Sequence, residues 1–170
     1  MASFDPPAPG LWVTSAGQFD TLVFRINAAG KYETHVQFGG QGDNALVLAA
    51  QGDGSFVAAG TWPGLIPESD PEAFGNTIKL GENQVEQCGH KGTCAYVAWV
   101  DAQAALKEVK VLGNTGSGPN TDVSAVLPRS VAIDENDGRV VVAGYFNYQV
   151  DLLGTHKATV QTGSLVRHTF

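Results

Sequence analysis

The sequence repeats itself, and this repetition limits the fold more than any other feature does. Residues 22–27 (LVFRIN) match residues 96–101 (YVAWVD) at a shift of 74 positions (96 − 22). Residues 53–62 (DGSFVAAGTW) match residues 137–146 (DGRVVVAGYF) at a shift of 84 positions (137 − 53). Similar segments that recur in order predict a repeated supersecondary unit, and neighbouring copies of such a unit stack to build one core.

The repeated segments have the composition of β-strands, because they are short and rich in β-branched and aromatic residues. Tight hairpin turns are expected at Asp53-Gly54 and Asp137-Gly138, since a glycine after Asp readily adopts the positive φ that such turns need. The chain holds 21 Gly among 170 residues, enough for many such turns. Strands are predicted at residues 22–27, 45–50, 55–62, 95–101, 130–134 and 139–146.

One segment, residues 101–110 (DAQAALKEVK), also fits a helix, with Asp101 as its N-cap. Its partner in the first copy, residues 31–38 (KYETHVQF), alternates apolar and polar residues as a strand does. The repeat therefore predicts a strand at residues 104–112. A third match, between residues 76–81 and 148–152, completes the unit.

These blocks resemble the SBBP-type β-propeller repeat, in which a strand ending in D-x-x-G is followed by GG-x-G-D and then by D-x-x-G-x-V-x-V-x-G. The matching segments are residues 24–62 and 131–146, with residues 98–113 as a degenerate copy. The resemblance covers most of residues 20–154 and implies an all-β protein built from antiparallel β-meanders of propeller type.

Two departures from the repeat are visible. Ala104 in the second copy replaces Gly30 of the first. The loops at residues 63–76 and 114–127 are longer than the repeat requires, and long surface loops are common places for individual function.

The strand count is too small for a closed ring. The chain starts with the last two strands of one blade, contains one whole blade (about residues 45–113) and ends with the first two strands of another. Propellers close with typically four to eight blades. We therefore expect an incomplete ring, or one completed by further copies or by a longer chain; a compact β-sandwich or barrel is the alternative.

This interpretation divides the chain into three parts. Residues 1–19 are a Pro-rich lead-in, residues 20–154 hold about two blades of repeats, and residues 155–170 form a C-terminal strand or tail. The formal charge is −7, and the 10 Lys and Arg residues are scattered, which argues against nucleic acid as a partner. No apolar run reaches the roughly 18 residues of a membrane-spanning helix, so no transmembrane segment is expected.

Cys88 and Cys94 lie at the two ends of a short loop that contains His90. A disulfide is the favoured interpretation, over unpaired thiols and over a metal site, because the pair with one histidine supplies only three ligands. A disulfide would indicate an oxidising compartment, and hence an extracytoplasmic or extracellular location.

Other chemistry is sparse in the sequence. The turn containing Asp134, Asn136 and Asp137 has the oxygen-rich side chains that Ca²⁺ favours, but its Asp-Gly pair is explained by turn geometry alone. The glycine-rich segment at residues 39–42 precedes a strand rather than a helix, so it offers no phosphate site. No nucleophile elbow is present, and the four histidines are dispersed. We therefore predict no enzyme activity, no cofactor and no metal.

Aromatic residues give the remaining hint of function. Trp62 and Phe146 occupy equivalent positions in the two copies, and Tyr145 precedes Phe146. Such residues can stack on sugars or anchor a protein, although sealing one blade against the next is the favoured role. Trp12, in the lead-in, is a further candidate anchor, whereas Trp99 is expected in the core.

The sequence thus predicts a non-catalytic binding or scaffold protein that is a component of a larger assembly. Its partners would be protein chains, including its own copies, engaged through loops and strand edges. The alternative is a lectin-like propeller assembled from several copies, in which equivalent pockets between blades hold a glycan. A non-catalytic piece of a larger propeller enzyme is the third hypothesis.

Overall fold

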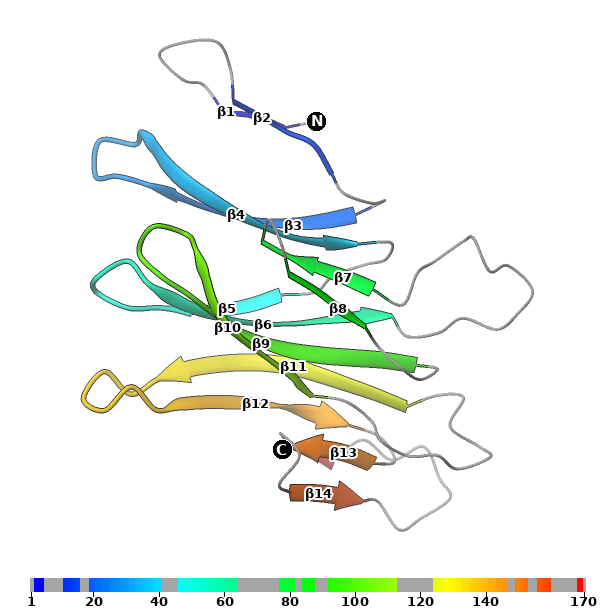
Figure 1. The fold of residues 1–170 in the computed structure, drawn as a ribbon. Helices are drawn as coiled ribbons and strands as arrows, with labels where there is room; N and C mark the ends of the chain where they lie inside the picture. The colour runs from blue at the N-terminus through cyan, green and yellow to red at the C-terminus, as the bar shows by residue number, and fades with distance from the viewer. Residues whose placement is uncertain are drawn as a thin grey trace.

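The computed structural model describes residues 2–4, 11–15, 19–40, 46–63, 77–81, 84–87, 92–112, 124–146, 149–152, 156–159 and 168–169. These residues form β-strands and turns, with no helix (Figure 1). The strands are β1 (Ala2–Phe4), β2 (Leu11–Val13), β3 (Phe19–Ile26), β4 (Tyr32–Gly40), β5 (Leu46–Ala50), β6 (Phe56–Pro63), β7 (Thr77–Leu80), β8 (Gln84–Gln87), β9 (Gly92–Val100), β10 (Leu106–Leu112), β11 (Ser124–Ile133), β12 (Val140–Phe146), β13 (Gln149–Leu152), β14 (His156–Thr159) and β15 (His168–Thr169).

The predicted all-β class is confirmed, and so is the strand in the ambiguous segment. β10 occupies Leu106–Leu112, where a helix was the competing interpretation, and it pairs antiparallel with β9. The long loop predicted at residues 114–127 is wrong at its end, because β11 already begins at Ser124. Its first residues pair in parallel with the start of β9, and a bulge between Pro128 and Ser130 then bends the strand.

Most of the strands build three stacked layers, and the β1–β2 and β13–β14 hairpins are separate two-stranded sheets (Figure 1). The first layer has the order β3-β4-β7-β8, and the middle layer has the order β5-β6-β9-β10. The third layer is the β11–β12 hairpin, which is joined to β9 and packs across β5 and β6. All other strand pairings are antiparallel, and the sheets formed by the described residues do not close into a ring.

The middle layer is built from two hairpins that are separated in the chain. Between them the chain forms the β7–β8 hairpin, which leaves the middle layer and pairs with β4 of the first layer, with Phe38 opposite Leu80. The second copy follows the same route as far as the strands show, since β13 and β14 form the equivalent hairpin and β13 contacts β10.

Two apolar cores lie on the two faces of the middle layer. Because successive side chains of a strand point to opposite faces, Ala58 and Ala98 pack against the first layer, whereas Val57 and Val97 pack against the third. Trp62 is 2% exposed in the first core, and its equivalent Phe146 is 6% exposed in the second. The middle layer is therefore covered on both faces.

The hairpin turns of the two copies are alike in atomic detail. In the first copy the Asn27 side chain accepts hydrogen bonds from the backbone N–H groups of Ala29 and Lys31, each at 3.0 Å. In the second copy Asp101 does the same for Gln103 and Ala105, at 2.9 and 2.8 Å. A residue with positive φ ends each turn, as in the common three-residue hairpin loop.

In the second copy that residue is Ala104, with φ of 63°, where the first copy has Gly30 with φ of 76°. A left-handed conformation costs a residue with a Cβ about 1–2 kcal/mol. We expect Ala104→Gly to raise the free energy of unfolding by about 0.5–1 kcal/mol, measured by urea denaturation.

Ala102 of the same turn is the matched control, because its φ is not positive. Ala102→Gly should lower the free energy of unfolding by about 0.4–1 kcal/mol, since it only adds freedom to the unfolded chain. Equal effects of the two substitutions would show that the turn conformation is not strained at Ala104.

Candidate functional site

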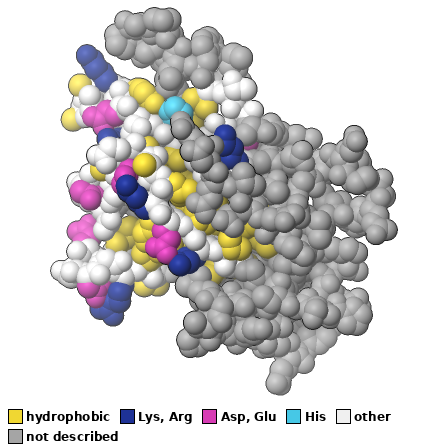
Figure 2. Space-filling model, viewed as in Figure 1, with side chains coloured by type: hydrophobic (Ala, Val, Ile, Leu, Met, Phe, Trp, Pro, Cys, Tyr) yellow, Lys and Arg dark blue, Asp and Glu magenta, His cyan; other side chains and the backbone are white. Residues whose placement is uncertain are grey.

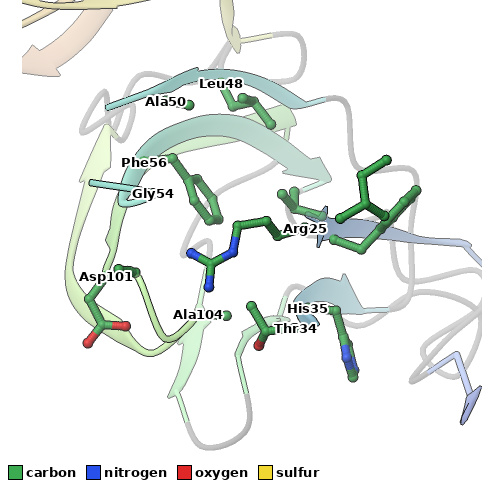
Figure 3. Close-up of a pocket in the computed structure, with 13 residues that line it drawn as sticks. Arg25, Thr34, His35, Leu48, Ala50, Gly54, Phe56, Asp101 and Ala104 are labelled. Carbon is green, nitrogen blue, oxygen red and sulfur yellow. The ribbon is translucent and has the colours of Figure 1, made fainter. Parts of the chain in front are cut away.

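A cavity of about 350 Å³ lies between the first layer and the middle layer, near the hairpin turns. We call it the inter-layer cavity. β3 contributes Arg25 to its wall, β5 contributes Leu48, and β6 contributes Phe56. The turn between β9 and β10 closes one side with Asp101 and Ala104 (Figure 3). The walls are mainly apolar, with Arg25 as the cation among them.

Arg25 extends into the middle of this cavity, between Phe56 and Ala104 (Figure 3). Its Nε donates to Glu33 Oε2 at 2.7 Å, so a neighbouring strand balances its charge. Gly54 gives the guanidinium room, because a Cβ at that residue would lie 2.5 Å from Arg25 Nη1. The φ of +87° at Gly54 also favours glycine there.

The acid at the rim, Asp101, is engaged by its own turn rather than by Arg25. Its Oδ2 lies 2.7 Å from Lys107 Nζ, and its carboxylate points away from the cavity centre in Figure 3. The hydrogen bond with Lys107, followed by those from the turn backbone, lowers the pKa of Asp101 below its ordinary value of 3.8. Each charged side chain of the cavity wall thus already has a partner of opposite sign.

A second, more polar groove of about 910 Å³ lies beside the cavity, between β4, β7 and the start of β10. The Tyr32 hydroxyl and His35 Nδ1 form a 2.6 Å hydrogen bond in its wall. Burial raises the pKa of Tyr32 above its ordinary value of 10.0. Sequence reasoning treated His35 as one of four dispersed histidines; its contact with Tyr32 three residues earlier is visible only in the structure.

The repeat places other residues at the equivalent positions between the middle and third layers. Trp99 stands where Arg25 does, and Val140 stands where Phe56 does. Trp99 packs against the second core, so an apolar ring occupies the place of the guanidinium. The chemistry of the inter-layer cavity is therefore not repeated in this chain.

Two of the sequence-predicted contact residues are core residues. Trp62 contacts the ring of Tyr96 at 6.0 Å between centroids, and Tyr96 stacks on Phe38 at 5.9 Å. Phe146 lies in the second core. These positions remove both side chains from the surface where a glycan would bind, and they fit the sealing role instead.

The other predicted contact residues are dispersed. Tyr145 is half-buried on β12, accepts a hydrogen bond from Arg129 and has that guanidinium carbon 4.8 Å from its ring centroid. Trp12 lies in β2 opposite Ser3, and only its backbone is described. Tyr145 lies on β12, and it is not among the described residues that line the inter-layer cavity.

The structure describes one of the two cysteines that are predicted to form a disulfide. Cys94 is 2% exposed on β9, where it faces Trp62 across the β6–β9 pair. Cys88 and His90 lie outside the described residues, so the disulfide stays a prediction.

In the acidic turn at residues 134–138, the carboxylates of Asp134 and Asp137 form ion pairs with Arg139. Arg139 Nε lies 2.5 Å from Asp137 Oδ2, and its Nη2 lies 3.8 Å from Asp134 Oδ2. Asp134 Oδ1 also accepts the backbone N–H of Asn136 at 3.0 Å. Across the described ranges, no group of three or more His, Cys, Asp or Glu residues is placed to hold a metal ion.

Exposed apolar side chains mark a feature that sequence reasoning missed. The large hydrophobic residues that are most exposed in the described part are Phe24 (46%), Ile26 (55%), Leu48 (45%) and Val141 (61%). Figure 2 shows hydrophobic side chains at the surface among acidic and basic ones. The repeat alone aligns Val141 with Val57 and Arg25 with Trp99. Since Val57 is 2% exposed in the structure, the alignment marks Val141 as a residue suited to a buried position.

Comparisons with protein-family models, curated proteins and solved structures found no match to this chain. The part of the chain that is described contains no helix long and apolar enough to cross a bilayer.

The lowered pKa of Asp101 predicts a pH dependence of stability. A carboxylate whose pKa is lower in the folded state stabilises the fold above its unfolded pKa, and this contribution is lost as pH falls through the folded value. Asp101→Asn keeps an acceptor for the turn, as Asn27 does in the first copy, but removes the titration. The free energy of unfolding should therefore differ between wild type and variant at neutral pH and converge as pH falls below 3.8.

Urea denaturation at several pH values measures this convergence. Asp53 also has a lowered pKa, caused mainly by Ser55, and it remains in both proteins as a common background. A constant difference between wild type and Asp101→Asn at all pH values would contradict the prediction.

Proposed function

We propose that this chain is a non-catalytic binding or scaffold protein whose layers are propeller-type repeats of the SBBP kind. It acts as a component of a larger assembly and engages protein partners at the open edges of its outer layers. The observation that supports this proposal most directly concerns β3 and β12. Both are long, apolar strands, and each pairs along its length with one described strand, β3 with β4 and β12 with β11.

A long, apolar and unprotected strand edge is unusual in a protein that works alone. An unpaired edge presents a row of backbone N–H and C=O groups, and natural proteins protect such edges with charges, prolines or covering segments. Residues 140–144 of β12 are Val-Val-Val-Ala-Gly, without a charge or a proline. Exposed Val141 and Ile26 lie on these two strands. Backbone pairing plus apolar contact is how proteins bind an added strand.

The glycan alternative receives less support. It depended on Trp62 and Phe146 at the surface, and both are buried. It also depended on equivalent pockets between layers, yet Arg25 in one interface corresponds to Trp99 in the next. The charged groups of the inter-layer cavity are held in ion pairs, which supports binding rather than catalysis as the role of this region.

A photo-crosslinking residue placed at Ile26 or at Val141 tests the proposal in an extract of the source organism. We expect covalent adducts with protein chains at both positions, identified by mass spectrometry. Glu108 on β10 is the control position, because its side chain is 52% exposed but lies away from both edges. A glycan array with the purified chain should show no binding. Binding on the array without protein adducts would replace this proposal by the lectin alternative.

We also propose that Cys88 and Cys94 form a disulfide and that the protein works in an extracytoplasmic or extracellular compartment. The burial of Cys94 beside Trp62 supports a structural role for this sulfur. In the denatured protein, iodoacetamide should modify the two cysteines only after reduction. Modification of both without reduction would contradict the disulfide and remove the argument for the compartment.

A further inference from the structure

We propose that the partner at these two edges is a second copy of the same chain. β12 of one copy pairs antiparallel with β3 of the next, with Val140–Gly144 opposite Ile26–Leu22. This inference rests on the proposed function, because it assumes that the strand edges bind protein, and it adds the identity of the partner and the register.

The template for this pairing lies within the chain. β6 and β9 pair antiparallel along their whole length, from Phe56 opposite Val100 to Pro63 opposite Thr93. The repeat makes β12 equivalent to β6, and β3 equivalent to β9. Applying the shifts of 84 and 74 to this register places Val140 opposite Ile26 and Val141 opposite Arg25.

Among the described residues, each of the two strand segments is bordered by another strand on one side only. On the side of β12 away from β11, β15 covers only Tyr145 and Phe146, through Thr169 and His168. In the described structure no strand borders residues 140–144 on that side, and none borders β3 on the side away from β4. The five-residue pairing can therefore form without moving β15.

The new pairing brings four strands together in the order β11-β12-β3-β4, which corresponds to β5-β6-β9-β10 of the middle layer, and β7 and β8 extend the sheet beyond β4. Paired residues of an antiparallel sheet share a face. Val141 of one copy therefore joins Arg25 on the face toward the second copy's middle layer. There it meets the inter-layer cavity, whose walls include Leu48 and Phe56.

The opposite face of the completed sheet is covered as well. Ile26 joins Val140, which already packs on the first copy's middle layer. The repeat shows how much burial follows: Val57 and Val100, equivalent to Val141 and Ile26, are each 2% exposed. Val141 and Ile26 are 61% and 55% exposed, and among the described residues no strand borders them in the way that β9 borders β6 in the middle layer. The proposed interface therefore covers Val141 and Ile26, and it brings Val141 to the cavity that Leu48 lines.

Cysteines placed at the predicted register test the pairing directly. In an Arg25→Cys, Val141→Cys double variant, each copy carries one thiol at each edge. Directly opposite residues have Cβ atoms about 4.5–5.5 Å apart, close to the spacing of a disulfide. Mild oxidation should give a ladder of head-to-tail oligomers, with peptides joined through residues 25 and 141.

The control is Phe24→Cys with Val141→Cys, because a shift of one residue places the two thiols on opposite faces. It should give no ladder. Equal ladders from both pairs, or none from the Arg25–Val141 pair, would overturn the proposed register.

Mass in solution tests whether copies associate without cross-linking. Sedimentation of the wild-type chain should show association that grows with concentration, and Val141→Lys should weaken it by about tenfold or more. Val141 is 61% exposed in the single chain, so this variant should fold. Glu108→Lys is the matched surface control and should associate as wild type does.

A wild-type chain that stays monomeric at all concentrations would overturn the pairing of copies. Photo-crosslinks from Ile26 and Val141 to other proteins would then still uphold the proposed function. The two sets of results therefore separate a wrong partner from a wrong function.

Discussion

The structure depends on a middle layer whose two faces are both apolar. Along β6 and β9, Ala58 and Ala98 face one side while Val57 and Val97 face the other. A strand with small or branched apolar residues on both faces is stable only when a layer covers each side. The first layer supplies Phe38 and the third supplies Val126, and each is 0% exposed. The stacking of three layers follows from this single requirement.

The edge strands of the outer layers resemble the strands of the middle layer in sequence, but in the described structure they are not covered in the same way. β3 and β12 are copies of β9 and β6, so they too have apolar side chains on both faces. Within the described part of the chain each borders a long strand on one side only. The exposure of Ile26 and Val141 is therefore a consequence of the repeat: a sequence suited to the middle of a stack stands at its two ends.

The sequence predicted the hairpins well because their signals are local. Asn27 and Asp101 fix their turns through their own side chains, and the pairing of β5 with β6 follows from the short turn between them. The transfer of β7–β8 to the first layer could not be predicted, because it depends on packing between Phe38 and Leu80, 42 positions apart (80 − 38). The inter-layer cavity was missed for the same reason, although the alignment of Arg25 with Trp99 already showed that the two interfaces differ.

The exposure of the strand edges explains why one interface has Arg25 where the next has Trp99. Trp99 lies in an interface that the chain itself covers, so a large apolar ring gains stability there by burial. Arg25 lies beside an open edge, where an equivalent tryptophan would add to the exposed apolar surface. An inward-pointing charge is one device that keeps an open edge soluble, and the 2.7 Å contact with Glu33 holds that charge in place. Because the long stem of Arg25 is apolar, it can still pack against Val141 of a second copy while the guanidinium stays with Glu33. One side chain can thus serve both the open and the paired state of the edge.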